Sequence, residues 1–408
     1  MKTSTFLSLF TSVLLSSAAI VNAQDPPANI TEVVLDNAAA DSIDLSALDP
    51  SIFNGAFAEI KAVYEQVVEV ESSGSDASTA RRRTLRYNRR ADTRKDIIDV
   101  HTHAVPSWFK QLVPVTGGNP TPDWTLEGHI AFMDQQGIDK SIIAISAPHA
   151  NVFQGQKAVT VALARVLNEA ISLYCRAYPT RLNFYAVVPL PYTTEAIAEA
   201  KYAINTLGAK GIVLTSNHEG TYLGNAQFTP FFKAINELGG RRVLYIHPGT
   251  PYVKVGNQLV EANPTPYPTG NIEFYFETAR TLMDLTLTQT IHNFTNIHYV
   301  IPHVGGAFPA ALDRILKSAP AIYDSSLAIY NTRFWWDSAG PTYYHQISGL
   351  LGIGVPKSQL LFGTDFPYAP IFTQAGSLAA VKNSPLFTDT EKTAIFKTNA
   401  QNLFQNQL

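Results

Sequence analysis

The chain has 408 residues and a net charge of −3, and 46% of its residues are hydrophobic while 15% are charged. This composition is typical of a globular protein and excludes a disordered, fibrous or repeat protein. The charge balance provides no basic field for nucleic acid, so we expect a small-molecule substrate. The only cysteine, Cys175, excludes an intramolecular disulfide, and we expect it to be buried in a helix rather than to act as a nucleophile.

Residues 1–23 have the pattern of a cleaved secretory signal peptide. Lys2 precedes an apolar run from Phe6 to Ile20, and the small-residue ending Val21-Asn-Ala suits a signal peptidase. We therefore expect the protein to enter the secretory pathway or to be secreted. An uncleaved membrane anchor is the alternative, but the run is shorter than the roughly 20 residues of a membrane span. We expect no membrane contact in the mature form.

Residues 24–95 differ in composition from the rest of the chain. They contain Pro, Ala, Asp and Ser clusters, an amphipathic stretch near 53–70, and a basic run with Arg81-Arg-Arg and Arg89-Arg90. We interpret this region as a pro-segment or mobile arm. The paired arginines resemble dibasic processing sites, so cleavage after Arg90 is a hypothesis. A solvated basic linker is the alternative.

Residues 96–408 alternate short β-branched runs with longer stretches of helical periodicity. The predicted strands are 97–100, 141–145, 182–188, 211–215, 243–246, 297–301, 334–336 and 360–362. The predicted helices between them are 126–136, 159–178, 194–207, 228–238, 277–292, 307–316 and 343–351. Eight βα units in one region indicate an α/β fold, a (β/α)₈ TIM barrel of the metal-dependent hydrolase type, rather than an open doubly wound sheet. No glycine-rich dinucleotide or phosphate motif follows a strand.

Two histidines end the first predicted strand. His101 and His103 are two residues apart, and because side chains alternate along a strand, both rings project to the same side. Neutral imidazoles held close together favour a divalent cation such as zinc. His-x-His pairs are common, however, so this motif alone leaves a metal role and a packing role equally open.

Three further strands end in polar groups. His247 ends the fifth strand, His303 follows the sixth, and Asp365 follows the eighth. In a TIM barrel the carboxyl ends of the strands converge on one site, so four such positions indicate a common centre. For the other histidines we expect surface or satisfied core roles. Of those, only His149 and His218 lie in loops that could reach this mouth.

At these positions the chain resembles the amidohydrolase-related family of aminocarboxymuconate-semialdehyde decarboxylase, and within it the fungal 6-methylsalicylate decarboxylases. The matching motifs are Asp99-Val-His-Thr-His-Ala-Val-Pro106, Ile246-His-Pro248, His303-Val-Gly-Gly-Ala-Phe-Pro309 with Arg314, and Leu361-Phe-Gly-Thr-Asp-Phe-Pro-Tyr368. The resemblance runs from about Asp96 to about Phe404. Residues 24–95 and the predicted secretion depart from it.

The resemblance implies one divalent metal ion, Zn²⁺ foremost and Mn²⁺ as the alternative, with His101, His103, His247 and Asp365 as ligands. His303 is implied as an acid/base or orienting group. Arg314 is implied as a substrate-binding residue that reaches a carboxylate, often across a homodimer interface. The alternative for Arg314 is an ordinary helix residue that pairs with a nearby carboxylate.

The loop after the first strand helps to define the substrate. It lacks the arginine that the picolinate-pathway branch carries, and its only basic residue between His103 and Trp124 is Lys110. It offers Trp108 and Phe109, which suit a neutral aromatic ring, although loop packing is the alternative. The first motif has His101 where the dihydroxybenzoate branch has glutamate. We therefore expect Trp108 to contact a small aromatic carboxylate of the 6-methylsalicylate type.

The leading functional hypothesis is metal-dependent, non-oxidative decarboxylation of a hydroxybenzoic acid such as 6-methylsalicylate to a phenol and CO₂. Asp365, helped by His303, is expected to deliver the proton to the ring carbon. The second hypothesis is hydrolysis of a lactone or amide with Asp365 as base. A third is a secreted binding protein that retains the site without turnover.

Overall fold

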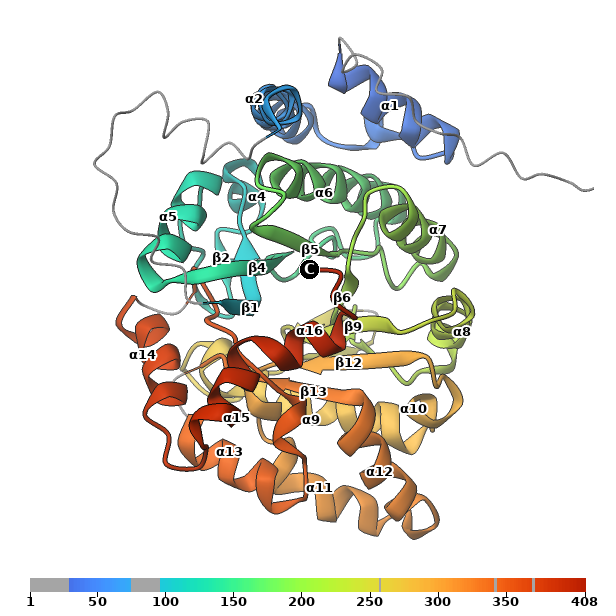
Figure 1. The fold of residues 1–408 in the computed structure, drawn as a ribbon. Coiled ribbons are helices and arrows are strands. Elements are labelled where there is room, and N and C mark those ends of the chain that lie inside the picture. The colour runs from blue at the N-terminus through green and yellow to red at the C-terminus, as the bar shows by residue number, and fades with distance from the viewer. Residues whose placement is uncertain (1–28, 75–95, 257, 341–342, 369–370) are drawn as a thin grey trace, which may run out of the picture.

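Eight parallel strands form one sheet at the centre of the molecule (Figure 1). They follow one another in the order β1 (Ile97–Ala104), β4 (Ile138–Ile145), β5 (Leu182–Ala186), β6 (Gly211–Thr215), β9 (Arg242–His247), β12 (Ile297–Ile301), β13 (Phe334–Asp337) and β14 (Leu360–Leu361). The computed structural model describes residues 29–74, 96–256, 258–340, 343–368 and 371–408. The predicted signal peptide and the dibasic sites lie outside these residues.

The chain after β14 returns to β1 and brings the two edges of the sheet together. The Val100 N–H donates to the Phe362 carbonyl at 3.0 Å, and the His103 N–H donates to the Phe366 carbonyl at 2.7 Å. A parallel bridge also joins Thr102 to Phe366. The sheet is thus a nearly closed barrel, which confirms the predicted (β/α)₈ fold, and each predicted strand overlaps a strand of this barrel.

Helices surround the barrel on its outer side (Figure 1). They are α4 (Ser107–Leu112), α5 (Leu126–Gln136), α6 (Lys157–Ala177), α7 (Thr193–Asn205), α8 (Thr229–Glu237), α9 (Thr269–Leu287), α10 (Thr290–Asn293), α11 (Phe308–Lys317), α12 (Tyr323–Arg333), α13 (Tyr343–Gly352), α14 (Ile371–Lys382), α15 (Asp389–Thr393) and α16 (Asn399–Leu403). Three short hairpins extend the loops: β2–β3 (Val115–Thr116, Asn119–Pro120), β7–β8 (Asn217–His218, Thr221–Tyr222) and β10–β11 (Tyr252–Val255, Gln258–Glu261).

The predicted helix 277–292 is wrong in its bounds. The structure has two helices there, α9 and α10, and α9 begins eight residues earlier, at Thr269. Between them Gln289 adopts a left-handed backbone with φ of 61°, which a continuous α-helix does not accommodate. The apolar periodicity continues across this break, so the sequence pattern did not reveal it.

Two further helices precede the barrel and lie beside α6 at the top of Figure 1: α1 (Ile30–Ala40) and α2 (Pro50–Ser73). Their buried apolar residues recur every three or four positions and join the same hydrophobic core as the barrel. The prediction of a mobile arm is therefore wrong for residues 29–74, because their apolar faces are buried against the barrel. Whether the region acts as a pro-segment stays a prediction.

A buried arginine on α6 ties these helices to the barrel. Arg165 is fully buried; its Nε donates to Glu199 at 2.9 Å, and its Nη2 donates to Asp41 at 2.6 Å. Its Nη1 donates to the Asn37 carbonyl at 3.1 Å, and the guanidinium lies over the Tyr202 ring. Two of its three nitrogens thus depend on the segment before the barrel, and a buried charge needs such partners.

Helix α6 is buried on all sides. Every residue from Thr160 to Tyr174 is buried, because the sheet covers one side and the N-terminal helices cover the other. Among the described residues, α6 is the one helix long and apolar enough to cross a membrane, but 78% of its most apolar window lies inside the fold. That burial is typical of the core helix of a globular protein.

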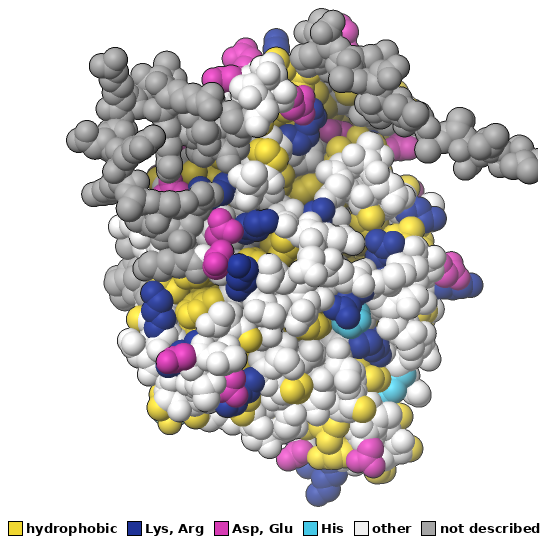
Figure 2. Space-filling view, viewed as in Figure 1, with side chains coloured by type: hydrophobic (Ala, Val, Ile, Leu, Met, Phe, Trp, Pro, Cys, Tyr) yellow, Lys and Arg dark blue, Asp and Glu magenta, His cyan; other side chains and the backbone are white. Residues whose placement is uncertain are grey.

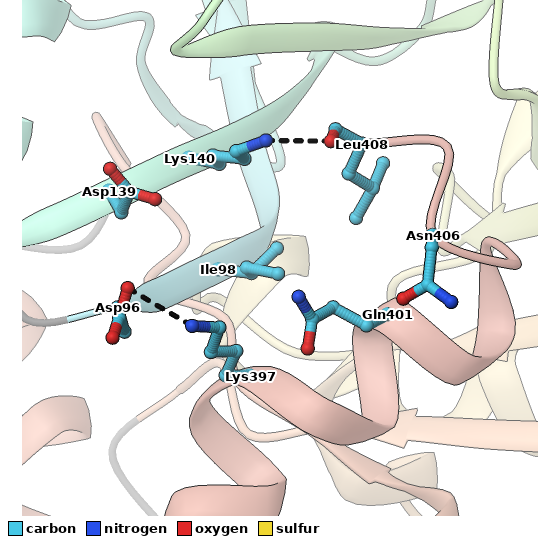
Figure 3. Close-up of a pocket in the computed structure, with 8 residues that line it drawn as sticks. All are labelled: Asp96, Ile98, Asp139, Lys140, Lys397, Gln401, Asn406 and Leu408. Atoms are coloured by element: carbon cyan, nitrogen blue, oxygen red, sulfur yellow. Dashed lines mark hydrogen bonds and ion pairs between the residues drawn. The ribbon is translucent and has the colours of Figure 1, made fainter.

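A small polar cavity lies at the end of the barrel where the strands begin (Figure 3). There Lys140 donates to the carbonyl of Leu408 at 2.6 Å, and Lys397 pairs with Asp96 at 3.1 Å. None of the predicted site residues lines this cavity. Basic and acidic side chains are interspersed over the described part of the face shown in Figure 2.

Candidate metal centre and active site

Four side chains from two strands and one loop meet at the other end of the barrel. His101 and His103 come from β1, His247 ends β9, and Asp365 follows β14. Each offers one ligand atom, and these four atoms lie within 4.8 Å of one another. The two β1 rings are 5.2 Å apart between centroids, as expected for residues on one side of a strand. The structure thus brings together all four residues predicted as metal ligands.

The distances within this cluster fit a metal ion. The Nε2 atoms of His101 and His103 are 3.3 Å apart, and Asp365 Oδ1 lies 3.3 Å and 3.2 Å from them. Ligand atoms about 2.0–2.1 Å from a tetrahedrally coordinated ion are separated by about 3.3 Å. Asp365 Oδ1 is buried and faces the Nε2 atoms of both histidines. A cation at the centre of the cluster would satisfy this oxygen.

Hydrogen bonds orient two of the imidazoles toward the cluster. His101 donates from Nδ1 to Asp337 Oδ2 at 3.0 Å, and both side chains are fully buried. His247 donates from Nδ1 to the Pro248 carbonyl at 2.7 Å. Each of these bonds places the ring proton on Nδ1 and leaves the Nε2 lone pair directed at the cluster, which is the usual arrangement of metal-binding histidines.

The charges around the cluster also favour a bound positive charge. Burial opposes the charged form of His101, but the charge and hydrogen bond of Asp337, followed by those of Asp365, raise its pKa to about 10. Burial lowers the pKa of His103 and of His247, so these two rings are neutral. Without a metal ion the cluster therefore holds a proton on His101, and a metal ion would compete with that proton for the Nε2 lone pair.

Asp365 is ionised in this environment. Burial raises its pKa, but the hydrogen bond and charge of His101, and the bonds from His103 and His303, outweigh burial and hold the pKa well below the usual range. Its backbone has a left-handed φ of 64°. Its N–H donates to the His101 carbonyl at 2.9 Å, which fixes the carboxylate beside the first strand.

His303 lies next to the cluster, as predicted. Its Nε2 is 3.8 Å from Asp365 Oδ2, and its N–H donates to Asp337 at 3.2 Å. The ring stacks on Tyr275 with centroids 5.5 Å apart. His303 Nδ1 has no hydrogen-bond partner among the described residues. This histidine can therefore carry a proton beside Asp365.

Two predicted substrate-binding residues do not join the cluster within one chain. The Arg314 side chain is exposed on the outer helix α11. Trp108 is 3% exposed and packs against α2. The contact is so close that a Cβ added to Gly55 would lie 2.9 Å from the Cβ of Trp108. Trp108 thus takes the alternative role, loop packing, because the N-terminal helices cover it. Trp124 is also buried and donates from Nε1 to His129.

Three residues around the cluster were not predicted. Asp337 ends β13, so the strand-end argument that identified His247 could have found it. Tyr368 packs its ring edge to face with His103 at 5.2 Å and its hydroxyl contacts Ser146. Tyr275 supports His303, and its position inside α9 gives no sequence signal.

Of the two loop histidines, His149 is the closer to the cluster. Its ring centroid lies 6.3 Å from that of His247, and burial lowers its pKa well below the usual value. His218 hydrogen-bonds Asn151 through Nδ1 at 2.5 Å. His218 is a satisfied core histidine, as predicted, whereas His149 is buried without a partner for either nitrogen among the described residues.

Comparison with known proteins places the chain in a group of decarboxylases. Over 76% of this chain and 87% of the relative, it is 30% identical to decarboxylase yanB of Aspergillus niger. It is 29% identical to the 6-methylsalicylic acid decarboxylase of Penicillium expansum, over 67% of this chain and 85% of the relative. Both relatives are fungal proteins.

Solved structures show the same fold. A protein described as amidohydrolase II matches with a TM-score of 0.69 and 28% identity over 76% of this chain and 99% of its own. A dihydroxybenzoic acid decarboxylase from Polaromonas sp. JS666, solved with manganese and 2-nitroresorcinol, matches with a TM-score of 0.63 and 20% identity over 77% and 98%. The family model described as amidohydrolase matches residues 98–405, and the chain therefore belongs to the amidohydrolase family.

Proposed function

We propose that this protein is a metal-dependent decarboxylase that converts a hydroxybenzoic acid such as 6-methylsalicylate to a phenol and CO₂. The observation that carries the proposal is the buried cluster of three histidines and Asp365, with His303 beside it. Relatives named as decarboxylases support this chemistry over the hydrolysis of a lactone or amide.

A divalent cation at His101, His103, His247 and Asp365 would supply a Lewis acid that holds the carboxylate and ortho-hydroxyl oxygens and stabilises negative charge. Three imidazoles and one carboxylate suit zinc, and we propose Zn²⁺ as the native ion. Manganese is the alternative, since a relative of similar fold was solved with it.

The side chains beside the proposed metal site then have to deliver one proton to the substrate ring. Loss of CO₂ leaves an electron pair on the ring carbon, and a proton must reach that carbon. Asp365 is ionised at rest, so it has to receive the proton before it delivers it. His303 Nε2, 3.8 Å from Asp365 Oδ2, is the neighbour that supplies it. Asp365 is thus the proposed donor to carbon and His303 its source.

The test is a product assay on the purified, metal-analysed protein. With 6-methylsalicylate we expect equal amounts of CO₂ and m-cresol, both lost when the metal is chelated and both restored when it is added back. About one metal ion per chain is expected for a single-metal site of this type. If no hydroxybenzoate releases CO₂ and a lactone is opened without loss of carbon, the protein is a hydrolase and the proposal is wrong.

Replacement of Asp365 by Asn tests the proton donor. The amide cannot hold a carboxylic proton, so we expect turnover to disappear while the circular dichroism spectrum and the melting transition remain those of a folded protein. The matched control is Asp324→Asn, an exposed carboxylate on α12, which should leave turnover unchanged. An active Asp365→Asn variant contradicts the assignment.

We further propose that Arg314 acts in a homodimer, where its exposed position on α11 lets it reach the partner's substrate carboxylate. Light scattering of the purified protein tests the dimer. Arg314→Ala should then raise KM for the carboxylate substrate more than it lowers kcat. A monomeric and fully active protein contradicts the proposal.

A further inference from the structure

His149 lies in the turn that follows β4, the second strand of the barrel. It is 2% exposed, and neither Nδ1 nor Nε2 has a hydrogen-bond partner among the described residues. Its backbone is left-handed with φ of 59°, and its N–H donates to the Ser146 carbonyl at 2.9 Å. The turn is thus held by the backbone and leaves the imidazole unused.

Neighbouring residues hold the loop without help from this ring. The Asn151 side-chain NH₂ donates to the Leu190 carbonyl, and the Asn151 side-chain oxygen accepts from His218 Nδ1. The centroid of the His149 ring lies 6.3 Å from that of His247, which is one of the residues proposed to bind the metal. Its position is therefore at the substrate end of the barrel.

Such an arrangement is costly unless a ligand completes it. A buried polar group without a partner destabilises the folded state, and so does a left-handed backbone at a residue other than glycine. Both features persist mainly where function requires them. His129, by comparison, accepts from Trp124 through Nδ1 and leaves only Nε2 without a partner among the described residues.

We propose that His149 is a specificity-determining residue that hydrogen-bonds the hydroxyl group next to the carboxylate on the aromatic ring of the substrate. This inference rests on the proposed function. A hydroxyl both donates and accepts, and so does a neutral imidazole. A methyl group in the same position would leave the buried nitrogens unpaired, and sites built to bind a hydroxyl reject such analogues strongly.

Binding of inert analogues tests this inference without relying on turnover. In 3-methyl-2-nitrophenol a nitro group stands where 6-methylsalicylate has its carboxylate, and 2-nitro-m-xylene has a methyl in place of the hydroxyl. Calorimetry on the metal-loaded protein should show that His149→Phe weakens binding of the nitrophenol about 10-fold to 100-fold. Binding of the nitroxylene should change less than about 2-fold, because it makes no bond to the ring nitrogens.

Further variants make the result specific. His149→Gln keeps a donor and an acceptor and should recover part of the lost affinity. His149→Ala is the second truncation if the phenylalanine variant does not fold, with the same ligand-selective loss expected. The control His345→Leu, on the exposed face of α13, should bind both analogues as the wild type does.

The outcomes separate this inference from the proposed function. Equal losses for both analogues, no loss for either, or loss of the bound metal in the His149 variants overturns the inference. If the wild type releases no CO₂, the proposed decarboxylase function is wrong, but the binding of the two analogues to His149 variants can still be compared. Ligand-selective loss in an active enzyme supports both.

Discussion

At the scale of single residues, Asp337 determines which nitrogen of His101 carries the proton. Its Oδ2 accepts from His101 Nδ1, while Oδ1 accepts from the N–H groups of His303 and Ala339. In Asp337→Asn the amide oxygen would stay with the two N–H groups, and the NH₂ would face His101. That donor moves the ring proton to Nε2, the proposed ligand atom.

We therefore expect Asp337→Asn to lower metal affinity about 10-fold to 100-fold, the usual effect of losing such a partner. Competition with a chelating dye measures this affinity, and Asp324→Asn is the matched control. If the Asn variant retains the metal as tightly as the wild type, the hydrogen bond does not direct the ligand atom.

Residue-scale prediction correctly identified the polar side chains at the strand ends that come together in the structure. His247, His303 and Asp365 were each predicted because they follow an apolar run, and the structure gathers them with His101 and His103. Trp108 was assigned to the substrate because loop position alone does not say which way a ring points. The covering helix α2 decides its direction, and that helix lies far away in the sequence.

At the scale of elements, the approach of β14 to β1 depends on a glycine. A Cβ added to Gly363 would lie 2.7 Å from His101 Cβ and 3.3 Å from Asp337 Oδ1. Gly363→Ala must push His101 away from the cluster. We expect a loss of stability of about 1–3 kcal/mol and a loss of metal affinity of about 10-fold or more.

Denaturant unfolding and metal titration measure the two effects. The matched control is Gly352→Ala near the end of α13, where nothing lies within 4 Å of an added Cβ. An unchanged metal affinity in Gly363→Ala, with the control also unchanged, would show that the two strands separate easily at this point.

Element prediction was accurate for the strands and less so for the outer helices. The predictions for β6 and β12 match the structure residue for residue, because buried parallel strands are short β-branched runs between turns. Helix α12 was not predicted, since its polar sequence has only two buried residues and little periodicity. The hairpins β2–β3 and β7–β8 are too short to leave a pattern.

At the scale of the whole molecule, the N-terminal helices are part of the fold. Deletion of residues 1–95 would expose the apolar residues of α6 and remove Asp41 and the Asn37 carbonyl from Arg165. Arg165 would keep Glu199, but the donors of a buried guanidinium that are left without a partner cost about 1–3 kcal/mol each. We expect the truncated barrel to be insoluble or to melt at a much lower temperature, whereas a chain that begins at Gln24 remains stable.

If the chain is cleaved after Arg90, we expect residues 29–74 to stay bound without a covalent link. Gel filtration should show one species, and denaturing mass spectrometry should show two chains. Separation of the segment under native conditions would contradict the packing described here. A secreted protein that starts at Gln24 and is uncut contradicts the cleavage hypothesis and supports the signal peptide.

Acid should destabilise the molecule through a histidine far from the cluster. His298 accepts from Trp335 Nε1 at 3.2 Å, and burial, with the charges of Arg241 and Arg333, lowers its pKa to about 3. The unfolded chain binds this proton near pH 6.5, so stability is lost as the pH falls from about 6.5 toward 3. The loss is at most about 1.4 kcal/mol per pH unit.

His298→Gln keeps an acceptor for Trp335 and cannot take up the proton. Between pH 7.5 and pH 5 we expect it to lose about 1–2 kcal/mol less stability than the wild type in urea unfolding. His345→Gln, on the exposed face of α13, should follow the wild type. An equal loss in the wild type and both variants would place the acid sensitivity elsewhere.

The burial of α6 on both sides also has a consequence during synthesis. Helices α1 and α2 leave the ribosome before the barrel, but the surface that covers their apolar faces includes α6, which is made about a hundred residues later. At the usual rates of about 5–20 residues per second these faces remain uncovered for seconds. During this interval the apolar faces of α1 and α2 are open to a chaperone. The interval ends when α6 packs against them and Arg165 pairs with Asp41.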